Sequence, residues 1–191
     1  GNTVLLGLAV GQGHLQAALR SVLALIGFSV GVAVAATLVH RDRQGEWSPA
    51  MTVAFGLETA LLVIFALVWH LVGLSPSDPI VHALIVLAAL AMGIQSGAVH
   101  RLRVPGVMTT YITGTLTTLM SVLTSRLRQA ASAPGAAQWE HLGLMAGVFV
   151  VYAVGALVGA VSWVHAPAVM GWLPVIAVAI VTVNATLRHA F

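Results

Sequence analysis

The feature that most constrains the fold is a series of apolar segments, most of them long enough to cross a lipid bilayer. Short stretches rich in Pro, Gly, Ser and charged residues separate them, as expected of loops. A transmembrane helix needs about 20 mainly apolar residues, and only the first segment is shorter. The segments cover residues 1–13, 17–40, 50–73, 80–100, 104–126, 142–165 and 168–189. The sequence therefore predicts an all-α, polytopic transmembrane helix bundle of about six to seven segments.

The low charge of the chain supports this class. Only 7% of its residues are charged, whereas a soluble domain carries roughly 25%. Every basic side chain is an arginine near a segment end, where it sets membrane topology and does not form a nucleic-acid surface. We predict one integral-membrane domain over residues 1–191, in a multi-pass protein of the cell inner (plasma) membrane, with the lipid bilayer as its surroundings.

One stretch, residues 92–118, departs from the apolar pattern. It becomes small and polar, breaks at Pro105-Gly106, and continues into a segment crowded with threonines. Pro105 lacks a backbone donor and Gly106 permits a reversal, so we predict an interruption of the helix between His100 and Val107. Irregular backbone persists in a bilayer where protein or a water-filled cavity satisfies it. The stretch therefore predicts either a binding region or a tight turn with a threonine-rich packing face.

A carboxylate within an apolar run completes the predicted site. Glu58 lies nine residues into such a run, where a charge costs about 2.5–3.5 kcal/mol and usually faces the bundle. It either pins helices as a protonated or hydrogen-bonded group, or takes up a proton or cation; we expect it to point inward, near residues 93–117. Threonines at this spacing also join helices structurally. The predicted substrate or ion pathway comprises Glu58, Gln95, Ser96, Thr109, Thr110, Thr113, Thr117, Asn2 and Thr3.

Short motifs recur in the same order along the chain and indicate an internal repeat. The halves cover about residues 1–75 and 80–191, and Phe28–His40 corresponds to Tyr152–Val164. The first half is incomplete, so we expect about one helix to precede Gly1 in a longer protein. The two halves should superpose after a rotation.

The motifs also resemble a known family. The chain opens with Gly-Asn-Thr, and its second half carries Gly-x-Gln, Arg, Val-Pro-Gly, Thr-Thr and Thr-Gly-Thr-Leu-Thr in that order. The residues concerned are Gly1, Asn2, Thr3, Gly93, Gln95, Arg101, Val104, Pro105, Gly106, Thr109, Thr110, Thr113, Gly114, Thr115, Leu116 and Thr117. On these residues the chain resembles the YoaK-like bacterial membrane proteins, a family of unknown function. The resemblance implies a polytopic topology and no known substrate; the family's first helix, with its Asp, is absent here.

Arginine positions distinguish two membrane topologies. If residues 80–100 and 104–126 both cross the bilayer, the arginines divide evenly between its faces. If the two segments make one net crossing together, Arg20 stands alone opposite Arg41, Arg43, Arg126, Arg128 and Arg188. The positive-inside rule favours the second arrangement, an inverted repeat. Segment lengths of about 28 and 34 Å favour the first. We prefer the inverted repeat.

The sequence contains no motif of a known catalytic or metal centre. His70 and His82 flank one turn and are the best candidate pair, but no HxxxH or HxxE spacing accompanies them on a helix. Neither GxSxG nor HExxH is present. We therefore predict no enzymatic activity, no cofactor and no bound metal.

Two functions remain open. The leading hypothesis is a small-solute or ion transporter of unknown substrate, with its site between the repeats. The alternative is a structural or accessory subunit of a larger membrane complex, or a homo-oligomer, which would use small-residue faces for helix packing. Such faces occur at Gly27-xxx-Gly31-xxx-Ala35 and Gly155-xxx-Gly159.

Overall fold

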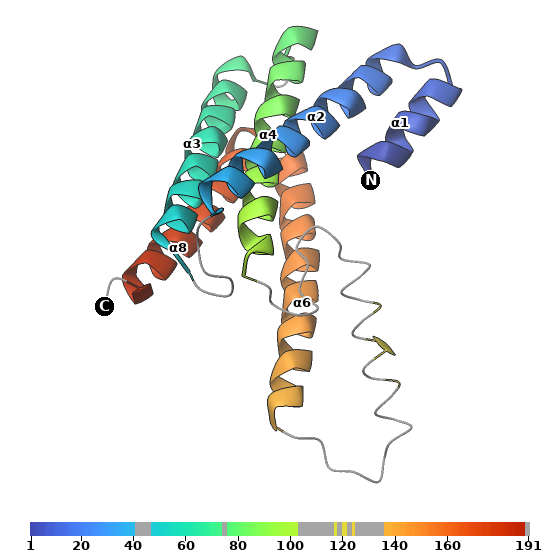
Figure 1. The fold of residues 1–191 in the computed structure, drawn as a ribbon. Helices are drawn as coiled ribbons and strands as arrows, with labels where there is room; N and C mark the ends of the chain where they lie inside the picture. The colour runs from blue at the N-terminus through green and yellow to red at the C-terminus, as the bar shows by residue number, and fades with distance from the viewer. Residues whose placement is uncertain are drawn as a thin grey trace. The chain divides into compact units, whose positions relative to one another are not determined.

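The computed structural model describes most of the chain as helix. It covers residues 1–40, 47–73, 76–102, 117, 120, 121, 124 and 136–189, without the side chains of residues 136–142 and 189. The helices are α1 (Asn2–Gly11), α2 (Leu15–Leu38), α3 (Pro49–Val72), α4 (Asp78–His100), α6 (Ala136–His165), α7 (Pro167–Met170) and α8 (Trp172–His189) (Figure 1). Within these residues there is no strand, and five helical spans are long and apolar enough to cross a membrane. The predicted all-α, polytopic bundle is confirmed.

The chain forms two compact units. One comprises Gly1–Arg103 and His165–Phe191, and the other comprises Val104–Val164. In the second unit, α6 is a continuous helix that begins before the predicted residue 142. The rest of that unit's apolar segment, 104–126, lies outside the described residues except for Thr117, Met120, Ser121 and Thr124, which are helical.

α4 ends where the sequence predicts an interruption. Its last residue is His100, and the backbone N–H groups of Arg101 and Leu102 donate to the carbonyls of Ala98 and Val99 in a closing turn. Helix therefore does not continue from residue 81 through residue 102. Pro105-Gly106 itself lies outside the described residues.

α2 and α4 run in the same direction and pack against each other. Near their starts, Arg20 Nη2 lies 3.1 Å from Asp78 Oδ1. Near their ends, Arg101 Nη2 donates to the carbonyl of His40 over 2.6 Å. We name the two ends of this unit the Asp78 end and the Arg101 end.

Glycines allow this close approach. A Cβ atom on Gly93 would meet the carbonyl oxygen of Phe28 and, at 3.0 Å, the Cα of Gly31; one on Gly97 would lie 2.8 Å from Ala35 Cβ. The predicted packing role of the Gly27-Gly31-Ala35 face is thus seen in the structure, with α4 as the opposing helix. Small residues let helix backbones approach in this way in membranes.

α3 begins at the Arg101 end with a side-chain cap. Ser48 Oγ accepts a hydrogen bond from the Met51 N–H over 3.1 Å, and Pro49 occupies the first turn, where a missing N–H costs nothing. The Trp47 ring stacks on Phe55 with centroids 5.1 Å apart. These contacts fix the entry of a helix that then returns to the Asp78 end.

α7 and α8 pack against α3 and were predicted as one helix, 168–189. The structure divides them at Gly171. The division follows from Pro174, whose ring nitrogen cannot donate to the Met170 carbonyl and whose ring crowds it. At this junction Trp69 Nε1–H donates to the Pro167 carbonyl over 2.8 Å. α8 then runs along α3 towards the Arg101 end (Figure 1).

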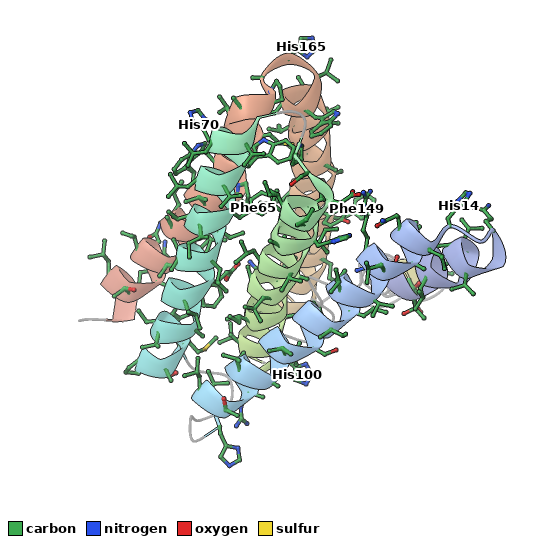
Figure 2. The ribbon with its side chains drawn as sticks, turned by 90° about the horizontal axis from the view of Figure 1, so that it is seen from above. His14, Phe65, His70, His100, Phe149 and His165 are labelled. Carbon is green, nitrogen blue, oxygen red and sulfur yellow. The ribbon has the colours of Figure 1, made fainter. Side chains whose placement is uncertain are left out.

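The two ends are visible in the side-chain view. Figure 2 shows His70 and His165 at one end of the first unit and His100 at the other. Between them lies a core of small and branched side chains from α2, α3, α4 and α8. Its buried members are Ala35, Val39, Met51, Ala54, Phe55, Leu62, Ala66, Ala91, Ile94, Ala98, Val175 and Val178.

Candidate functional site

Glu58 lies in the middle of the buried face of α3. That face follows helical spacing through Ala54, Phe55, Glu58 and Leu62, because residues three and four apart share one side of a helix. The neighbouring positions Phe55 and Leu62 belong to the core that includes residues of α4 and α8. Glu58 itself is 1% exposed. The carboxylate therefore points into the bundle, as its cost in a bilayer led us to expect.

One oxygen of the Glu58 carboxylate is not satisfied by the residues the structure describes. This Oε2 atom is buried and has no hydrogen-bond partner among them. The hydroxyl groups of nearby helical residues are different: Thr59 Oγ1 donates to the Phe55 carbonyl and Thr182 Oγ1 to the Val178 carbonyl, each over 2.8 Å. A hydroxyl can donate to its own helix, whereas an ionised carboxylate only accepts. Glu58 therefore needs a donor or a cation from outside α3.

The surroundings of Glu58 are apolar. The core residues that α4 and α8 contribute are Ala91, Ile94, Ala98, Val175 and Val178. The titratable groups of these two helices stand towards their ends, at Asp78, His82, His100, Arg188 and His189. A carboxylate in such surroundings is a polar group that burial makes costly unless something pairs with it.

The structure places two of the predicted polar residues on the helix beside Glu58. Gln95 and Ser96 are half-buried on α4, next to Ile94, a buried member of the core. The two units are described separately, so Thr117, which is exposed and helical, is not placed relative to Glu58. Thr109, Thr110 and Thr113 lie outside the described residues.

Asn2 and Thr3 occupy a different part of the first unit. Both are exposed at the start of α1, and α1 packs against α2. Glu58 is on the face of α3 that meets α4 and α8. The described contacts therefore do not bring Asn2 and Thr3 to Glu58.

Sequence reasoning missed the contribution of α8. Val175 and Val178 line the core beside the buried face of α3, and Thr182 is half-buried one turn beyond Val178. The signal was present, since Thr182 is a hydroxyl within an apolar run. A single hydroxyl does not indicate a site from sequence, whereas the threonines at 109–118 are closely spaced.

The two candidate histidines differ in solvent exposure. His70 is exposed near the end of α3, whereas His82 Nε2 is buried without a hydrogen-bond partner in the described part of the chain. Over the residues with described placement, no group of three His, Cys, Asp or Glu side chains could hold a metal ion. Glu58 is therefore the residue on which the candidate site rests.

The fold and this buried acid define a polytopic helical membrane protein. Residues 1–184 match a family described as "Protein of unknown function (DUF1275)". The chain is 32% identical over 188 residues to the UPF0700 transmembrane protein YoaK of Bacillus subtilis (strain 168), a match that covers 98% of this chain and 81% of that protein. The chain belongs to this family, which confirms the YoaK-like resemblance. No solved structure matches the chain.

Proposed function

We propose that the protein moves a small solute or ion across the cell inner (plasma) membrane, with Glu58 as the group that binds a proton or cation. One observation carries the proposal: a carboxylate that is 1% exposed, in the middle of a membrane-spanning helix, with an Oε2 atom that no described residue pairs. Ionisable groups inside membrane helices typically mark substrate or ion pathways. Transport requires no catalytic residues, and we propose that the protein is not an enzyme.

The chemistry of Glu58 fits reversible binding better than a structural pin. A pinning carboxylate would be expected to hold donors from a neighbouring helix, and the core residues of α4 and α8 offer methyl and methylene groups instead. An ionised Glu58 can accept a proton or coordinate a cation, and either event neutralises a charge that burial disfavours.

The test is flux through the purified full-length protein in liposomes. A pH-sensitive dye inside the liposomes reports proton movement, and imposed Na⁺ or K⁺ gradients and small solutes are screened as drivers. We expect flux in the wild type and its loss in Glu58→Gln, which keeps the size of the side chain but neither ionises nor releases a proton. Asp78→Asn is the matched control and should retain flux, because Asp78 is exposed at the start of α4.

Two results would contradict the proposal. Full flux in Glu58→Gln would remove Glu58 from the mechanism. If the wild type moves no ion or solute and is instead recovered in a stable complex with another membrane protein or with itself, the role is that of an accessory subunit.

A further inference from the structure

We propose that the ion bound at Glu58 is a proton and that the site does not hold a metal cation. This assignment rests on the proposed role of Glu58 in transport and narrows that role to one ion. A proton needs a single oxygen atom, whereas Ca²⁺ and Mg²⁺ take about six or more oxygen ligands. The number of oxygen atoms around Glu58 therefore distinguishes the two kinds of ion.

The backbone beside Glu58 contains no unwound segment in the described part of the first unit. Membrane proteins hold Na⁺ and K⁺ largely with carbonyl oxygens of extended or broken segments. α3, α4 and α8 run past Glu58 as uninterrupted helix, so their carbonyls accept hydrogen bonds within each helix. The interruption at Gly171 is distant from Glu58. A Cβ atom added to Gly171 would lie 3.3 Å from the Cα of Ala66, and Ala66 is about 12 Å from Glu58 along α3.

α8 brings one hydroxyl near the level of Glu58. The Gly171–Ala66 contact sets the register of α8 against α3. Counted from that contact at about 1.5 Å per residue, Glu58 lies about 12 Å along α3 and Thr182 lies about 16 Å along α8. Thr182 is therefore about one helical turn nearer the Arg101 end, and its hydroxyl donates to the Val178 carbonyl.

α4 contributes one amide oxygen at a similar level. α3 ends and α4 begins at the Asp78 end. Counted from there, Glu58 lies about 21 Å along α3 and Gln95 about 26 Å along α4. Ser96 follows the buried Ile94 by two residues and so lies on the opposite side of α4.

These side chains supply too few oxygen atoms for a metal ion. Glu58 has two, and Gln95 and Thr182 have one each, so even if both reached a bound ion, the described set would hold about four of the six or more that Ca²⁺ and Mg²⁺ take. Thr59 follows Glu58 on α3 but is turned about 100° from it around the helix. A metal cation would lose its water at Glu58 without a full replacement.

A proton removes the cost of burial without further ligands. An ionised carboxylate only accepts hydrogen bonds, and the Oε2 atom of Glu58 has no partner among the described residues. Protonation removes the charge and gives the group a donor of its own. That O–H can donate to a carbonyl of α3, as Thr59 Oγ1 does to the Phe55 carbonyl over 2.8 Å. The apolar core therefore favours the protonated form over a metal complex.

Competition at Glu58 tests this assignment in the intact protein. A carboxyl group that holds a proton reacts with an apolar carbodiimide, whereas one that holds a metal ion is protected. Proteoliposomes of the full chain are treated at fixed pH in NaCl, KCl, CaCl₂ or MgCl₂, or in choline chloride of equal ionic strength, and mass spectrometry quantifies the adduct on Glu58. We expect the same rate in every salt. Where most Glu58 is ionised, the rate should fall about tenfold per pH unit.

The melting temperature gives a second readout of metal binding. A ligand that binds only the folded state raises the melting temperature. In detergent micelles, each metal salt should therefore shift the wild type and Glu58→Gln by the same amount. Glu58→Gln is the matched control because it keeps the size of the side chain and removes the carboxylate that would bind a cation.

The outcomes separate this assignment from the transport proposal. An adduct that forms more slowly in a metal salt than in choline chloride would overturn the proton assignment and leave Glu58 as a cation site in transport. A rise in melting temperature seen only in the wild type would have the same meaning. An adduct that forms only after the protein is unfolded would overturn both proposals, because a sealed Glu58 exchanges neither kind of ion.

Discussion

At the scale of single residues, Glu58 differs from hydroxyl-bearing residues of the membrane-spanning helices. Ser29, Thr37, Thr59 and Thr182 lie in membrane-spanning helices and satisfy their hydroxyls with carbonyls of their own helix. Such bonds need no partner helix and are tolerated in lipid. Glu58 has no equivalent bond at Oε2. A group that is buried without compensation lowers stability, and its presence is explained most simply by function.

This difference predicts a gain in stability when Glu58 is replaced by an apolar residue of similar length. Glu58→Met removes an unsatisfied buried carboxylate and keeps the volume, so the free energy of unfolding should rise by about 1–3 kcal/mol. The gain should accompany loss of flux. The measurement is thermal or denaturant-induced unfolding in detergent micelles, with Asp78→Asn as a control that changes stability by less than about 1 kcal/mol because the Arg20 pair is exposed. A marked loss of stability in Glu58→Met would show that the carboxylate pins the bundle.

The direction of Glu58 could be predicted from sequence, but its neighbours could not. Depth in an apolar run is enough to indicate that a carboxylate turns inward, because lipid offers it no partner. Which helices surround it depends on tertiary packing. Gln95 and Ser96 lie on α4, which packs on α3, so their place beside Glu58 stays a prediction; Asn2 and Thr3 belong to α1, which packs on α2. Thr182 of α8 was not anticipated.

At the scale of helices, glycines on both α2 and α4 allow the two helices to pack closely. The sequence led to different predictions for the glycines of the two helices. The Gly27-Gly31-Ala35 face was predicted to pack. Gly93 was grouped with a polar binding stretch. In the structure it packs against α2, where a Cβ atom added to Gly93 would collide with the Phe28 carbonyl oxygen. A small residue in an apolar helix has the same sequence signature whether a backbone or a ligand approaches it, so only the contacts separate the two roles.

The glycine contact predicts a loss of stability in Gly93→Ala. The new methyl group must displace the backbone of α2, and overpacking of this kind costs about 1–3 kcal/mol. Gly56→Ala is the matched control: Gly56 lies within α3 and nothing stands within 4 Å of its added Cβ. In the same unfolding assay the control should retain or slightly increase stability, since alanine favours helix by about 1 kcal/mol. Equal stability of the two variants would contradict the close approach of α2 and α4.

The junction of α7 and α8 shows the limit of reading helix ends from apolar length. Residues 168–189 form one continuous apolar run, and hydropathy alone gives one helix. The interruption at Gly171 depends on Pro174, whose effect falls one turn before the proline itself. The Trp69–Pro167 hydrogen bond then holds the junction against α3. Hydropathy alone predicts neither the interruption at Gly171 nor the hydrogen bond between Trp69 and Pro167.

At the scale of the whole molecule, fold class follows from segment length, and topology requires contacts between segments. Five spans long enough to cross a bilayer were recognisable in the sequence. Arginine counts left two topologies open, and these differ in residues 104–126, most of which lie outside the described part of the chain. The internal repeat stays a prediction: its test compares α2 with α6, which belong to separately described units.

The most direct test of the central claim is whether Glu58 exchanges protons inside the folded protein. An apolar carbodiimide enters the bilayer and reacts with protonated carboxyl groups, and mass spectrometry locates the adduct. In proteoliposomes we expect an adduct on Glu58 that forms more slowly as the pH rises, because ionised Glu58 does not react. It should be absent in Glu58→Gln. An adduct that forms only after the protein is unfolded would mean that Glu58 is sealed within a structural core, and would contradict the account.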